Sequence, residues 1–160
     1  ILIAGATSLR AQRFAHKVAE TPASLTKKIA SVHVITSFAV IVLGTLVTGS
    51  GPHAGDEKAR RFGFDIQTVA WIHADVVIFL LGTTFAFFVA TGTSVATKRR
   101  LKIFTVIALA QGAIGYIQYF TGLPELLVAA HLLGATLVWG AAWSLIKLAD
   151  SGYRLQRLTS

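Results

Sequence analysis

Four long runs of apolar residues dominate this sequence, and each is about as long as a helix that crosses a lipid bilayer. They cover approximately residues 29–48, 67–91, 101–121 and 124–148. A transmembrane helix needs roughly 20 apolar residues, because it rises ~1.5 Å per residue through a hydrocarbon core of ~30 Å. The four runs therefore predict an all-α chain that forms a transmembrane four-helix bundle.

Composition excludes several other kinds of protein. Hydrophobic residues make up 54% of the chain and charged residues only 14%, too little charge to cover a soluble domain of this size. Cysteine is absent, which excludes disulfides, zinc ribbons, iron–sulfur clusters and covalently attached c-type haem. No P-loop, dinucleotide fingerprint or nucleophile motif is present.

The positive charges are concentrated in alternate connections. Segments 10–28 and 97–102 and the tail 149–160 are basic, whereas loop 49–66 has balanced charge and turn 122–125 has no base. Positively charged connections stay in the cytoplasm, so the basic segments are expected inside and the other two outside. The net charge of +8 is thus explained by membrane topology, and nucleic acid is not expected as a partner. A multi-pass protein of the cell membrane is predicted.

These patterns divide the chain into four parts. Residues 1–9 are apolar and are expected to be the end of a preceding transmembrane helix. Residues 10–28 are expected to form a cytoplasmic loop, 29–148 the four-helix bundle, and 149–160 a cytoplasmic tail.

Two histidines lie inside the apolar runs at a matching depth. His73 and His131 are each about six residues from the outer end of their span, or roughly 9–10 Å below the outer face. Ionisable residues inside a span are costly and are usually functional. With imidazole as the available ligand, two axial histidines suit a haem iron that transfers electrons. Haem ligation by this pair is predicted, and a hydrogen bond to a neighbouring helix is the alternative for each histidine.

Other polar residues are expected to have supporting roles. His33 lies at a different depth, so a structural or interfacial role is expected. Asp75 follows His73 by two residues and faces the opposite way, where it needs a partner, water or a proton path. Gln111 and Gln118 are seven residues apart and share a face that is expected to point into the bundle. The glycines of the third and fourth spans are expected to allow close helix approach.

Loop 49–66 is a candidate partner for the polar edge of a haem. It is rich in glycine and contains three bases, Lys58, Arg60 and Arg61, on the same expected side as the paired histidines. Backbone N–H groups and bases bind anions, so Arg60 and Arg61 are candidate partners of the haem propionates. An ordinary connecting loop is an equally good interpretation of each residue.

Several segments resemble haem A synthase, a cytochrome oxidase assembly family. They are GTLVTGSGPHAGD at 44–56, RFGFD at 61–65, VAWIHAD at 69–75, and QGAIGYIQ at 111–118 followed by Gly122-Leu123-Pro124 and His131. The resemblance covers about residues 29–148. The outer loop is most similar to actinobacterial members.

The resemblance implies the second half of an eight-span protein built from two similar four-helix bundles. In the family this half binds haem b, and His73 and His131 match its iron ligands. The other half is thought to hold the substrate haem O and an essential glutamate, so no catalytic residue can be placed on this sequence.

The implied reaction oxidises a methyl group of haem O to the formyl group of haem A, for cytochrome c oxidase biogenesis. Haem O synthase and cytochrome oxidase assembly proteins are implied partners, besides membrane lipid. Two alternatives remain open from the residues themselves: a non-enzymatic b-type cytochrome that carries electrons, and a structural or assembly protein without haem.

Overall fold

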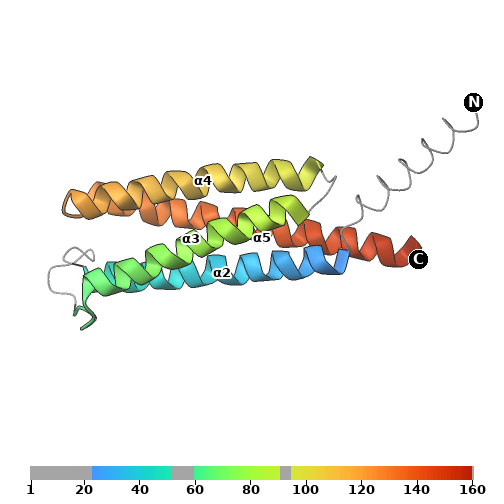
Figure 1. Ribbon diagram of the computed structural model, residues 1–160. Coiled ribbons are helices and arrows are strands. Elements are labelled where there is room, and N and C mark those ends of the chain that lie inside the picture. The colour runs from blue at the N-terminus through green and yellow to red at the C-terminus, as the bar shows by residue number, and fades with distance from the viewer. Residues whose placement is uncertain (1–22, 52–59, 91–94, 160) are drawn as a thin grey trace, which may run out of the picture.

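The computed structural model describes residues 23–51, 60–90 and 95–159. Their order is α2 (Ala23–Ser50), α3 (Ile66–Ala90), α4 (Val95–Phe120) and α5 (Glu125–Thr159). Figure 1 shows the four helices side by side, each antiparallel to the next. The predicted all-α four-helix bundle is therefore confirmed for the described part of the chain. Residues 1–9, expected to end a preceding helix, lie outside the described residues.

All four helices are long and apolar enough to cross a membrane. The spans are Ser24–Ser50, Ile66–Ala90, Val95–Phe120 and Glu125–Ala149. Many large apolar side chains of these spans are exposed on the outside of the bundle, as lipid-facing residues are in a membrane. The chain is a multi-pass membrane protein by this measure, as its four apolar runs predict.

Two helices extend beyond the expected apolar runs. Residues 23–28, assigned to a cytoplasmic loop, form the first turns of α2, and residues 149–159, assigned to a tail, continue α5. Hydropathy marks only the part of a helix that lies in hydrocarbon. Lysine and arginine extend their charged ends to water, so a helix continues past that boundary without an apolar signal.

The packing of the helices places α3 and α5 on a diagonal of the bundle. Helix α2 packs closely against both α3 and α5, and α4 packs closely against α5. The contact between α3 and α4 is the weakest between neighbours. Side chains that point inward from α3 and α5 therefore face each other across the interior.

The buried apolar core fills only one half of the bundle. We call residues 23–37, 77–90, 95–108 and 137–150 the basic half, and residues 38–50, 66–76, 109–120 and 125–136 the loop half. Every member of the core cluster lies in the basic half: Ala30, Val34, Leu80, Phe87, Leu101, Phe104, Ala108, Val138, Ala142, Leu145 and Ala149. Side chains thus fill the interior of the basic half, while the loop half has no comparable cluster among the described residues.

The turn between α4 and α5 forms as its sequence predicts. Gly122 has a positive φ of 75°, and Leu123 follows at 61°. The Leu123 N–H donates to the Gln118 carbonyl (2.9 Å), which closes the end of α4 in a Schellman motif. The first bond of α5 follows at once, from the Val128 N–H to the Pro124 carbonyl (3.1 Å).

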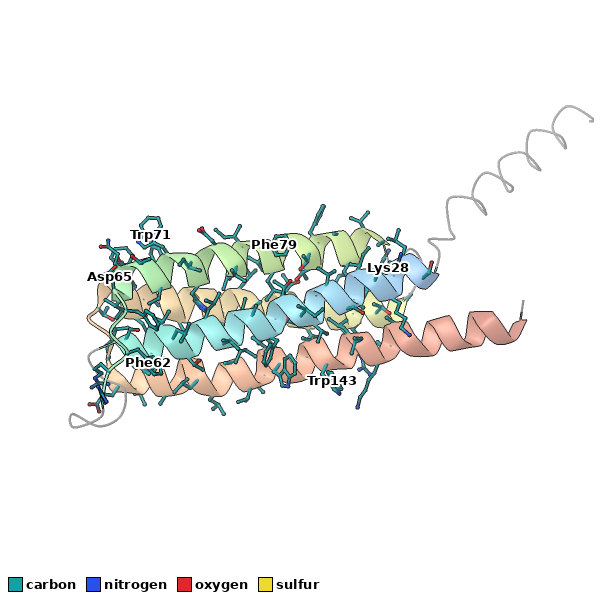
Figure 2. All side chains as sticks on the ribbon, turned by 90° about the horizontal axis from the view of Figure 1, so that it is seen from below. Lys28, Phe62, Asp65, Trp71, Phe79 and Trp143 are labelled. Atoms are coloured by element: carbon teal, nitrogen blue, oxygen red, sulfur yellow. The ribbon has the colours of Figure 1, made fainter. Side chains whose placement is uncertain are left out.

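The start of α3 is capped by an acidic side chain. One Asp65 carboxylate oxygen accepts hydrogen bonds from the Thr68 backbone N–H and hydroxyl group, both at 2.8 Å. These bonds, led by the hydroxyl bond, hold the pKa of Asp65 below its usual value. Nearby, the Phe62 N–H donates to the Gly49 carbonyl (3.0 Å), which ties this segment to the end of α2. Phe62 and Asp65 lie together at this end in Figure 2.

Candidate functional site

The loop half brings His73 and His131 together across the bundle. His73 belongs to the interior stripe of α3, which continues one heptad later with the buried Leu80. His131 holds the matching place on α5, one heptad before the buried Val138. Both side chains are half-buried, and each has a buried Nδ1 atom. The two histidines therefore lie on the inward stripes of diagonal helices, and their joint ligation of a haem stays a prediction.

Each of these histidines lies against a glycine on a neighbouring helix. A Cβ atom on Gly44 of α2 would lie 3.3 Å from Cε1 of His73. A Cβ atom on Gly115 of α4 would lie 3.4 Å from Cε1 of His131. The two contacts repeat the same arrangement in the pairs α2–α3 and α4–α5. Side chains at the two glycines would compete with the imidazoles for interior space.

Further polar groups surround the histidine pair. The Gln111 amide lies directly over Gly134 of α5, where a Cβ atom would collide with it. Gln118 is buried on the same interior stripe of α4, so the predicted inward face is confirmed. Buried atoms without a hydrogen-bond partner include Nδ1 of His73, Nδ1 of His131 and Oε1 of Gln111. Most buried polar atoms are hydrogen-bonded, so these three atoms leave unused hydrogen-bonding or ligating capacity in one region of the bundle.

This arrangement fits a flat macrocycle with two axial imidazoles. The ligands would come from diagonal helices, and glycines instead of bulky side chains flank them. The described residues contain no cluster of three or more histidine, cysteine, aspartate or glutamate side chains that could hold a bare metal ion. A porphyrin supplies four iron ligands itself and needs only two from the protein.

The predicted propionate partners lie at the correct end of the bundle. Arg60 is exposed and Arg61 is half-buried, next to Phe62, whose ring packs against Gly49. The other expected base, Lys58, and His53 lie outside the described residues. Arg60 and Arg61 stay a prediction as haem contacts.

His33 has a structural environment, as its depth suggested. Its side chain is fully buried in the basic half, and Nε2 lies 3.1 Å from the Thr84 hydroxyl oxygen. The rings of Phe104 and Phe87 pack edge-on against it, with centroids 4.5 Å and 5.9 Å away. Its Nδ1 is buried without a partner, like those of the other two histidines. Aromatic side chains pack around His33, and none of the described glycines has His33 among the atoms nearest to an added Cβ.

The glycines divide into two groups that the sequence does not separate. Gly115 and Gly134 make room for side chains from a facing helix, as expected. Gly112 and Gly140 have no described atom within 4 Å of an added Cβ, so they do not bring two of the four described helices together. Whether each glycine points into or away from the bundle follows from its spacing to buried residues on the same helix. That spacing can be read from the sequence. Gly44 was part of a recognised motif, but its contact with His73 was not anticipated.

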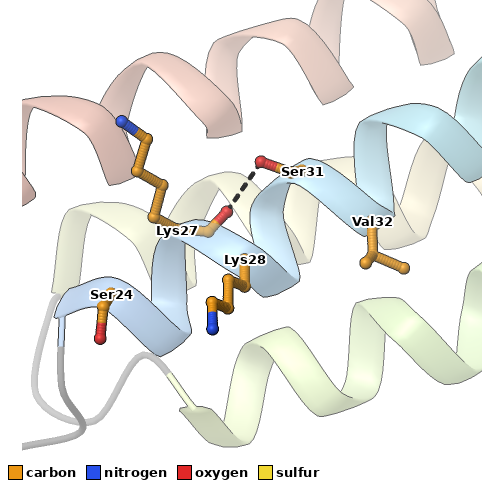
Figure 3. Close-up of a pocket in the computed structure, with 5 residues that line it drawn as sticks. All are labelled: Ser24, Lys27, Lys28, Ser31 and Val32. Atoms are coloured by element: carbon orange, nitrogen blue, oxygen red, sulfur yellow. Dashed lines mark hydrogen bonds between the residues drawn. The ribbon is translucent and has the colours of Figure 1, made fainter.

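An open hollow lies far from His73 and His131, at the start of α2. Figure 3 shows its lining, which is Ser24, Lys27, Lys28, Ser31 and Val32. The Ser31 hydroxyl donates to the Lys27 carbonyl (3.0 Å), an interaction within the helix. The hollow is wide open and lined by one helix, so it lacks the enclosure of a cofactor site.

No family model, curated protein or solved structure matches this chain. Inference about its function therefore starts from the histidine pair and its surroundings.

Proposed function

We propose that the bundle binds haem b between His73 and His131 and forms the haem-b half of a haem A synthase. The observation that carries this proposal is the pairing of two inward histidines on diagonal helices, each beside a glycine of the neighbouring helix. The motif resemblance adds the identity of the enzyme. Haem O, bound in the other half, is the proposed substrate, and haem A for cytochrome oxidase is the proposed product.

The protein groups have separable tasks in this proposal. His73 and His131 would hold the iron, and Gly44 and Gly115 leave space for their rings. Arg60 and Arg61 bind the propionates at the end of the bundle. A haem iron held by two histidines would supply one-electron transfer.

The ligand assignment is tested with the full-length protein. His73→Ala and His131→Ala should each remove the low-spin b-type signal from reduced-minus-oxidised absorbance and electron paramagnetic resonance spectra. His33→Ala is the matched control, because this buried histidine lies in the basic half and should leave the signal intact. Low-spin bis-histidine spectra retained in both site variants would overturn the assignment.

The enzymatic assignment needs a separate measurement. Cells that express the full-length gene with haem O synthase should accumulate haem A, measured by chromatography of extracted haems. The His73→Ala variant should reduce haem A formation strongly and leave haem O. Full haem A formation in that variant would contradict a role for this half in the reaction.

A b-type cytochrome without enzymatic activity is the second candidate. It is favoured by the site itself, because two axial histidines leave no iron position for a substrate. A normal b-type spectrum together with no haem A formation by the full-length protein would select this candidate.

A further inference from the structure

Asp75 points away from the interior of the bundle. It follows the inward-facing His73 by two residues, which turns it to the opposite side of α3. Its side chain is exposed, and no residue in the described part of the chain forms a hydrogen bond or ion pair with it. The carboxylate therefore does not serve the histidine site or bond to a neighbouring helix of the bundle.

The depth of Asp75 makes this exposure unfavourable in lipid. The residue lies nine positions after the start of α3 at Ile66, or ~13 Å along the helix axis. Large apolar side chains on the same helix are exposed around it, including Ile72, Ile78 and Phe79. Figure 2 shows Trp71 and Phe79 on the outer side of α3. An ionisable group at such a depth normally has a protein partner or a water-filled path.

The same face of α3 has room for another helix. Gly82 lies one heptad after Asp75, is exposed, and has no described atom within 4 Å of an added Cβ. Ala86 follows one turn later and is also exposed. Small residues allow close approach between transmembrane helices, and polar side chains link them. Asp75 would make this helix–helix contact specific, because its carboxylate pairs best with a basic side chain on the partner helix.

We propose that α3 packs through Asp75, Gly82 and Ala86 against a further transmembrane helix that presents a lysine or arginine to Asp75. The partner helix is not one of the four described here. Their lysines and arginines lie at the basic end, apart from Arg60 and Arg61 before α3, so a parallel second copy offers Asp75 no base at its depth. This inference does not depend on haem binding.

Photo-crosslinking in native membranes tests the proposal. p-Benzoylphenylalanine replaces Phe79 in the full-length protein, and in a matched control it replaces Val106 on α4, at a similar depth. Both side chains are exposed, at 58% and 67%. The probe on α3 should capture a transmembrane peptide with a lysine or arginine at the level of Asp75, identified by mass spectrometry, and the α4 probe should not.

Charge variants then distinguish a specific contact from general proximity. Asp75→Asn keeps the shape of the side chain and should lower the crosslink yield at least fivefold, as should Asp75→Lys. Replacing the base of the captured helix with aspartate should restore the yield in the Asp75→Lys protein. The proposal is overturned by crosslinks to lipid only, by a captured helix without a base, or by a yield that both variants leave unchanged.

Discussion

The basic half and the loop half of the bundle surround their inward histidines with different side chains. In the basic half, two phenylalanine rings enclose His33 and Thr84 lies within hydrogen-bonding distance of it. In the loop half, His73 and His131 lie beside glycines. The core cluster is confined to the first region. The neighbours of a histidine, more than its presence inside a span, therefore distinguish the packed His33 from the two histidines that we propose as ligands.

The largest effect that would test this contrast is expected at Gly115. Gly115→Leu should weaken haem b binding by about 100-fold, because a side chain there would displace the His131 ring. Residues that contact and orient a metal-ligating histidine strongly affect the affinity of the protein for the metal. Gly112→Leu is the matched control on the same helix, since its Cβ would meet no described atom within 4 Å. Haem titration of the two purified variants measures the difference. Equal affinities would remove the special role assigned to Gly115.

A smaller effect, on stability, is expected at His33. His33→Ala should lower the free energy of unfolding by about 3 kcal/mol, because it leaves a cavity between packed aromatic rings. His131→Ala in haem-free protein should cost less, since the loop half has no comparable core among the described residues. Denaturation of the haem-free variants compares the two. A greater loss for His131→Ala would contradict the division into packed and ligand-binding halves.

The smallest effect concerns the pH dependence of the cap on α3, next to the loop half. Hydrogen bonds from Thr68 lower the pKa of Asp65, so the ionised cap stabilises the fold fully above the unfolded pKa of about 4. That stabilisation is lost as pH falls through the lower folded pKa. Asp65→Ala should therefore lower the thermal midpoint slightly at neutral pH.

The difference between wild type and Asp65→Ala should then shrink below pH 4. Thr68→Val removes the hydroxyl donor only and should have part of the neutral-pH effect. A difference that stays constant between pH 7 and pH 3 would exclude the carboxylate as its source.

Most of the fold could be predicted from the sequence because lipid imposes a simple length and polarity rule on each span. The helix ends could not, as α2 and α5 continue into regions where charged residues are tolerated on a helix. The Gly122 turn was predictable, since few residues adopt its positive φ. Asp65 shows a missed signal: an aspartate three residues before a threonine at the start of an apolar run is a typical helix cap.

The candidate site was predictable only in part. Helical rise alone placed His73 and His131 at one level. Their pairing with Gly44 and Gly115 depends on which helices are neighbours and how they are rotated, and periodicity within one helix contains neither. The outward position of Asp75 was recoverable from its spacing to His73, but its lack of a partner in the described bundle required the arrangement of all four helices.

Helix α5 runs without a break from the His131 position to the basic end of the bundle. The helix passes the end of its apolar span at Ala149 and continues to Thr159, and Figure 1 shows it projecting beyond its neighbours. From His131 to Thr159 is ~42 Å at the usual helical rise, so a tilt of ~5° moves the far end by roughly 4 Å. A contact made at the projecting end of α5 would therefore act on the same continuous helix that holds His131.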